Sequence, residues 1–69
     1  MHRYTYIWWG DGYLVYDADQ YIGKDDQVDE VQLMVDAGVA QRIDAADKEE
    51  IIDAHWGDNL HELLAALYE

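Results

Sequence analysis

Two short stretches of this chain carry side chains that metal ions commonly use as ligands. In the first, Asp17, Ala18 and Asp19 place carboxylates at the first and third positions of a calcium-binding loop pattern. The pattern then fails, because Ile22 stands where the loop needs a glycine and Val28 stands where it needs a bidentate glutamate. We therefore predict an ordinary acidic connection at this place and no metal site.

The second stretch is HWGDNLH, in which His55 and His61 bracket Asp58. A glycine separates two predicted helices here, so the spacing places no third metal ligand and defines no acid-base geometry. The sequence contains no Ser-His-Asp, phosphate-loop or glycine-rich dinucleotide pattern. We predict that the protein is not an enzyme and that it uses no metal and no cofactor.

Net charge is the most extreme property of the sequence. Sixteen Asp or Glu residues stand against four Lys or Arg residues, which gives a formal net charge of -12 over 69 residues. Proteins that bind nucleic acid neutralise phosphates with Lys and Arg, so this composition argues against direct binding of DNA or RNA. The same charge favours basic protein surfaces as partners. Because 51% of the residues are hydrophobic, we expect a folded chain and not a disordered one.

The length of the chain allows one small domain, and we treat residues 1–69 as a single compact unit that is expected to be monomeric. There is no cysteine, so no disulfide and no cysteine-based zinc site can support the core. The sequence shows no run of about eighteen apolar residues and no signal-like pattern at its start. We therefore expect a cytoplasmic protein that is neither secreted nor inserted in a membrane.

The stretch 4–16, YTYIWWGDGYLVY, is the element against which we expect the rest of the chain to pack. Its aromatic and β-branched residues flank a Gly-Asp-Gly turn, which predicts a hairpin of strands 3–9 and 13–17. A two-residue turn would pair Trp8 with Val15, and a three-residue loop would shift this pairing by one. Both faces of the hairpin are apolar, so other elements must pack on it.

The rest of the chain is mainly helical in pattern. A polar connection over 17–24, with Tyr21 and Ile22 as anchors, leads to a helix over 26–37, and a second helix is expected over 47–55. The third helix follows Asp58 as its N-cap and buries a leucine stripe. The leucines of this stripe are Leu60, Leu63, Leu64 and Leu67. Between the first two helices, the segment 39–43, VAQRI, is either a short third strand or part of a helical corner. The predicted fold class is α+β, with an antiparallel sheet of two or three strands covered on one side by two or three helices.

Acidic side chains gather on the outer faces of the first two predicted helices. In the helix 26–37, which Asp25 or Asp26 would cap, Val28, Val31 and Val35 share one side, while Leu33 lies toward the acidic side. We predict that the acidic faces bind a partner, although a solvated surface that only maintains solubility is the alternative. The predicted partner-binding residues are Asp25, Asp26, Asp29, Glu30, Asp36, Asp47, Glu49, Glu50 and Asp53.

Residues 53–67, DAHWGDNLHELLAAL, resemble the motif of the barstar ribonuclease inhibitors: an aromatic residue, Gly, an acid, Asn-Leu and then a leucine-spaced helix. The shared positions are Gly57, Asn59 and Leu60. The chain departs from this family at His61 and Ala65, where the family carries acidic residues that bind the nuclease. The resemblance implies, as an alternative function, inhibition of a basic ribonuclease.

As a whole, the chain is similar to small acidic anti-CRISPR proteins that phages encode, in particular those that act on type I-C effector complexes. The similarity lies in the short cysteine-free chain, the aromatic hairpin YTYIWWGDGYLVY and the acidic helix faces. It implies a DNA-mimicking inhibitor in the bacterial host cell, which binds a crRNA-guided complex and blocks recognition of target DNA. A third interpretation is a passive protein-interaction module, whose contacts would be apolar residues such as Trp8, Trp9 and Leu33.

Overall fold

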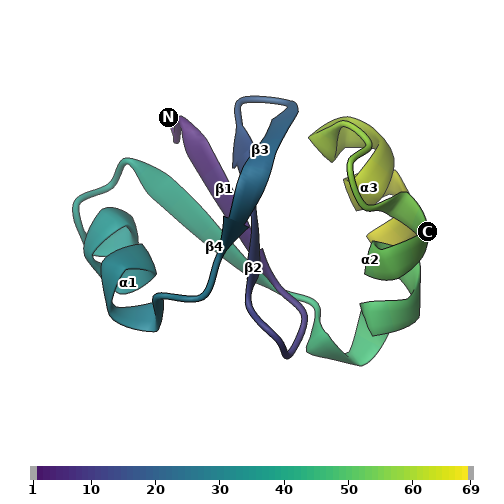
Figure 1. The fold of residues 1–69 in the computed structure, drawn as a ribbon. Coiled ribbons are helices and arrows are strands. Elements are labelled where there is room, and N and C mark those ends of the chain that lie inside the picture. The colour runs from purple at the N-terminus through teal and green to yellow at the C-terminus, as the bar shows by residue number, and fades with distance from the viewer. Residues whose placement is uncertain (1, 69) are drawn as a thin grey trace.

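The computed structural model describes residues 2–68 and shows an α+β fold built on a four-stranded sheet (Figure 1). The strands are β1 (Tyr4–Trp8), β2 (Tyr13–Asp17), β3 (Gln20–Asp25) and β4 (Ala40–Asp44). The helices are α1 (Val28–Asp36), α2 (Glu49–His55) and α3 (Leu60–Leu67), and a short 3-10 helix, η1 (Ala46–Lys48), precedes α2. None of the helices between residues 2 and 68 has the length and apolar character that crossing a membrane requires.

The sheet is mixed, with the strand order β3-β2-β1-β4. The pairs β1–β2 and β2–β3 are antiparallel, whereas β4 pairs in parallel with β1. The predicted fold class is confirmed, and residues 40–43 of the segment 39–43 lie in strand β4, but the expected antiparallel sheet of two or three strands is wrong. The reason is α1, which follows β3 and returns the chain to the end of the sheet where β3 began, so that β4 runs in the direction of β3 and β1.

The hairpin forms with neither of the two predicted registers. Trp8 pairs with Tyr13 and not with Val15, so that residues 9–12 form the loop. Within this loop, the backbone nitrogen of Trp9 donates a hydrogen bond to the carbonyl oxygen of Gly12 at 3.3 Å. The observed partner of Trp8 lies two residues from the partner that a two-residue turn would give. Because side chains alternate between the faces of a strand, a shift of two leaves each side chain on its predicted face of the sheet.

Helices cover both faces of the sheet, which corrects the expectation of cover on one side. Figure 1 shows α1 on one side of the sheet and α2 with α3 on the other. The buried residues accordingly form two clusters. The cluster under α1 contains Tyr6, Tyr13, Val15, Val31 and Ala40. The cluster under α2 and α3 contains Ile7, Trp9, Leu14, Tyr16, Ala45, Ile52, Leu60, Leu63 and Leu67. Both faces of β1 and β2 are apolar, so removing both faces from water requires two layers of helix.

Strand β3 occupies most of the segment 17–24 that was predicted to be a polar connection. A tight turn leads into it, in which Ala18 has a positive φ of 55°. A bulge then directs Tyr21 onto the ring of Tyr16, with 5.7 Å between the ring centroids, and leaves Ile22 56% exposed. Of the two expected anchors, Tyr21 is therefore correct and Ile22 is wrong.

Two predicted helix caps differ from those observed. Asp25 accepts a hydrogen bond from the backbone nitrogen of Gln27 at 2.8 Å, which fixes the turn before α1, and Gln27 itself is the N-cap residue. At α3 the N-cap is Asn59 and not Asp58. Its side chain accepts a hydrogen bond from the backbone nitrogen of Glu62 at 2.9 Å, three residues into the helix, as N-cap side chains do.

The buried stripe of α1 is shorter than predicted. Val31 is fully buried, and Met34 and Val35 pack against the same cluster, but Val28 is 48% exposed because the helix only begins there. Leu33, which the periodicity places toward the acidic side, is 70% exposed. The outer face of α1 therefore combines one exposed leucine with the acidic side chains.

Candidate functional site

The nine predicted partner-binding residues lie in two groups on opposite sides of the sheet. We name as the α1 acidic group Asp25, Asp26, Asp29, Glu30 and Asp36, and as the α2 acidic group Asp47, Glu49, Glu50 and Asp53. All nine are exposed except Asp25, which is half-buried at the end of β3. Because α1 and α2 cover opposite faces, the structure does not unite these residues in one flat surface (Figure 1).

None of these nine carboxylates is in a salt bridge within residues 2–68. The ion pair of this part of the chain is Arg3 with Asp17, at 3.1 Å between Nε and Oδ1, and the ring of His55 contacts Asp58 at 3.2 Å. The Arg3 guanidinium binds Asp17 through a second nitrogen as well, and this carboxylate raises the pKa of Arg3. The negative charge of both acidic groups is thus uncompensated by the chain's own described cations.

The other basic side chains lie over aromatic rings. The Arg42 guanidinium is 5.7 Å from the centre of the Tyr13 ring, and the Lys48 ammonium is 5.8 Å from that of Tyr68. Lys48 also donates a hydrogen bond to the carbonyl oxygen of Leu67, at the end of α3. These cations therefore support the cores and the end of a helix, and they leave the acidic groups free for a partner.

Uncharged donors hold three carboxylates of the α1 acidic group in place. Gln27 donates its backbone N–H to Asp25 at 2.8 Å and its side-chain amide to Asp26 at 2.9 Å. On the helix itself, the amide of Gln32 donates to Asp36 at 2.8 Å. Such bonds orient a carboxylate without neutralising its charge, so this surface is both negative and partly ordered.

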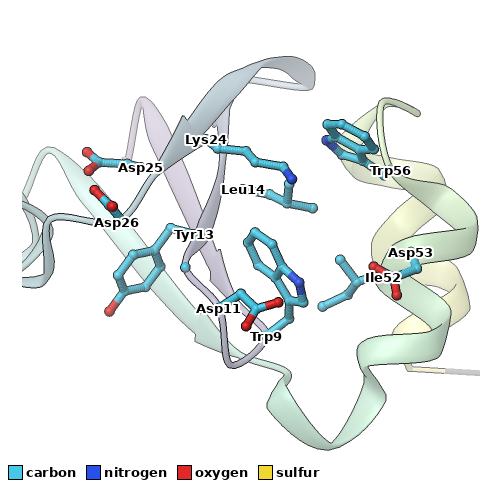
Figure 2. A pocket seen from close by; sticks show the side chains of 11 residues that line it. Trp9, Asp11, Tyr13, Leu14, Lys24, Asp25, Asp26, Ile52, Asp53 and Trp56 are labelled. Atoms are coloured by element: carbon cyan, nitrogen blue, oxygen red, sulfur yellow. The ribbon is translucent and has the colours of Figure 1, made fainter.

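A cavity of about 550 Å³ lies at the end of the sheet, between the hairpin loop, the end of β3 and α2 (Figure 2). Asp25 and Asp26 of the α1 acidic group line it together with Asp53 of the α2 acidic group and Asp11 of the hairpin loop. The structure therefore brings three of the nine predicted residues to one concave site. In Figure 2, Asp11 lies beside the Trp9 indole, whereas Asp25 and Asp26 point to the far side, near Tyr13.

Sequence reasoning missed the centre of this cavity. The Lys24 ammonium lies 4.1 Å from the ring centre of Trp56 and 5.4 Å from that of Trp9, with Leu14 and Ile52 beside them. The reason is that 20–25 was predicted to be a connection and not a strand. In the strand, Lys24 pairs with Leu14, and their side chains therefore lie on the same side of the sheet.

Two buried tyrosines have altered acidity. Burial raises the pKa of Tyr16 to about 12, with further contributions from Tyr21 and Asp58. The Tyr16 hydroxyl also has no hydrogen-bond partner in the described part of the chain. Burial likewise raises the pKa of Tyr6, and the nearby Asp25 adds to the shift. Both shifts make these hydroxyls poorer acids, and neither activates a nucleophile.

The two stretches that first pointed to metal chemistry have structural roles. Asp17 is the partner of Arg3, and the ring of His55 contacts Asp58 at the junction of α2 and α3. Across residues 2–68, the structure contains no group of three His, Cys, Asp or Glu side chains arranged to hold a metal ion. His61 is exposed on α3.

Comparison with known proteins adds no relative. No protein-family model, no curated protein and no solved structure matches this chain. The chain's own charge, the order of its acidic groups and the cavity at the end of the sheet are the features that bear on its function.

Proposed function

We propose that this protein is an inhibitor that binds a basic, nucleic-acid-binding surface of another protein and keeps nucleic acid away from it. One observation carries the proposal: a net charge of -12 accompanies two acidic groups that have no internal salt bridges, while the chain's described cations bind elsewhere. A surface of this kind attracts Lys and Arg side chains, and it repels the phosphates that they normally bind.

The spacing of the α1 acidic group supports a mimic of nucleic acid. Asp29 and Asp36 are seven residues apart, which corresponds to roughly 10 Å along a helix axis. One DNA strand carries a phosphate about every 3.4 Å of axis, so these residues span about three phosphates. Glu30 lies between them, and the Gln32 amide holds Asp36. A rigid acidic helix can therefore meet a row of basic side chains without any chemical reaction.

The resemblance to anti-CRISPR proteins nominates the target, a type I CRISPR effector complex in the cytoplasm of a bacterial host. The DNA path of such a complex must be basic, because it binds the phosphates of its target. Occupation of that path by a small acidic monomer would prevent recognition of target DNA.

The test is capture of an effector complex by the tagged protein, followed by measurement of target-DNA binding at low and high salt. The variant Asp29→Lys/Glu30→Lys/Asp36→Lys moves the net charge from -12 to -6, because each reversal adds two charges. It should lose at least about tenfold in affinity, which corresponds to about 1.4 kcal/mol. Unchanged capture by this variant, with its fold intact, would contradict the proposal.

A matched control reverses the same amount of charge on the other side of the sheet. The variant Asp47→Lys/Glu49→Lys/Glu50→Lys also has a net charge of -6. If the α1 acidic group forms the interface, this control retains more affinity than the α1 variant. Equal losses would show that only the total charge matters. Capture of a small basic ribonuclease alone, without any effector complex, would favour the barstar-like alternative.

An exposed leucine is the specific feature that favours the passive interaction module. Leu33 is 70% exposed among the carboxylates of α1. The variant Leu33→Ala should leave binding of a mimic nearly unchanged, whereas it should abolish binding by an apolar module.

A further inference from the structure

The cavity at the end of the sheet contains one cationic side chain of the protein itself, Lys24. The Lys24 ammonium lies within about 6 Å of two indole rings, Trp56 at 4.1 Å and Trp9 at 5.4 Å, which is the geometry of a cation-π contact. Trp9 is 6% exposed and forms the floor, whereas Trp56 is 53% exposed and leaves part of its ring open to solvent. The walls of the cavity therefore have the chemistry that attracts cations, and about half of the Trp56 surface is exposed beside Lys24.

The carboxylates that line the same cavity form no salt bridge with this cation. Asp11 and Asp53 both line the cavity, and neither forms a salt bridge with Lys24 or with any other described cation. Figure 2 shows Asp11 beside the Trp9 indole and Asp53 on α2, next to Ile52. The Lys24 ammonium thus contacts two indoles, while two carboxylates of the same cavity have no salt-bridge partner and can bind an incoming cationic group.

We propose that this cavity receives an arginine side chain of the protein partner, which stacks on Trp56 and binds Asp53. This inference rests on the proposed function, because it names the group through which a basic partner would be anchored. A guanidinium suits the site better than an ammonium, since it is planar, stacks on aromatic faces and binds a carboxylate with two parallel hydrogen bonds. The volume of about 550 Å³ lies within the roughly 300–1,000 Å³ that is usual for ligand pockets.

The test needs no partner protein and uses a short peptide, acetyl-Gly-Arg-Gly-amide, as the probe. The chain has three tryptophans, so the indole N–H groups give three NMR signals that single Trp→Phe variants can assign. The probe should shift the signals of Trp9 and Trp56 saturably. It should leave that of Trp8 in place, because Trp8 packs in the cluster under α1. The same peptide with citrulline, which is uncharged, should bind at least about threefold more weakly.

Two variants and two matched controls complete the experiment. Trp56→Ala and Asp53→Asn should each weaken binding of the arginine peptide by about threefold to tenfold. Tyr68→Ala removes another exposed ring that lies under a lysine, and Glu62→Gln removes an exposed carboxylate of α3 that does not line the cavity. Both controls should bind as the unchanged protein does.

The possible results separate this inference from the proposed function. Equal shifts with arginine and citrulline, or unchanged binding by Trp56→Ala, would overturn the arginine site even if an effector complex is captured. Arginine-specific binding that depends on Trp56 and Asp53 would support the site even if the effector complex is not the partner. Because both variants change exposed side chains, a folded control spectrum is expected for each.

Discussion

The hydroxyl of Tyr16 offers a quantitative test of the core, through the variant Tyr16→Phe. The residue is fully buried between the sheet and α3, and its hydroxyl has no hydrogen-bond partner in the described part of the chain. An unsatisfied buried polar group costs about 1–3 kcal/mol. Removing the oxygen leaves a space smaller than a methyl group, which costs less than about 1 kcal/mol. The variant should therefore be more stable at pH 7, by about 1 kcal/mol.

The pH dependence of the free energy of unfolding provides a second test of the Tyr16 hydroxyl. The pKa of Tyr16 is raised from 10.0 to about 12 in the folded protein. Between these values the unfolded chain has lost the proton and the folded chain keeps it, so the free energy of unfolding falls as pH rises. Each pH unit in this interval costs about 1.4 kcal/mol. The advantage of Tyr16→Phe over the unchanged protein should accordingly widen from pH 10 toward pH 12.

The assay is thermal and urea unfolding of both proteins, with Tyr21→Phe as the matched control. A gain of 1 kcal/mol raises the Tm of a domain this small by about 4–8 °C. Tyr21 packs against Tyr16 but is only partly buried, so its loss of a hydroxyl should change stability by less than about 0.5 kcal/mol. Other tyrosines titrate in all three proteins, so only the difference between them reports Tyr16. A Tyr16→Phe protein with lower stability, or with a parallel pH profile, would refute this reasoning.

Three further substitutions test the cavity, the hairpin loop and a helix cap. Lys24→Gln removes the cation that competes for the indoles, so the arginine peptide should bind about threefold more tightly in the same NMR titration; weaker binding would show that Lys24 assists the site. Gly12→Ala places a methyl group 3.2 Å from the carbonyl oxygen of Asp25, and should lower the Tm by an amount equivalent to about 1 kcal/mol. Asn59→Ala removes the N-cap of α3 and should cost about 1 kcal/mol in urea unfolding, whereas Asp58→Ala should cost less.

The sequence predicted those elements whose own residues determine them. The hairpin and the leucine stripe of α3 follow from local periodicity and from glycine, whereas the sequence left open whether 39–43 is a strand or part of a helical corner. Strand β3 was missed because its pattern is interrupted: a bulge at Ile22 reverses the alternation, so Tyr21 and Lys24 face the same side although they are three residues apart. The parallel pairing of β4 follows from the helix between two strands, but only after β3 is recognised as a strand.

Charge alone selected the predicted partner-binding residues, and it gave no information about their positions. The acidic residues of α1 and α2 were identified, but the pattern did not say how the two faces lie relative to each other, and the structure places them on opposite sides of the sheet. Asp11, Lys24 and Trp56 were not predicted to meet, since they come from a loop, a strand and the end of a helix. Only the packing of α2 against the sheet makes them neighbours.

Salt separates the two roles that the acidic charge can have. The molecule has a radius of gyration of 11.0 Å, which is comparable with the Debye length of about 8–10 Å near physiological ionic strength. Added salt therefore screens repulsion among the carboxylates and should stabilise the fold. The same screening weakens attraction to a basic partner. If Tm rises with salt while capture of the partner falls, the loss of binding cannot come from unfolding, and it must come from the acidic surface itself.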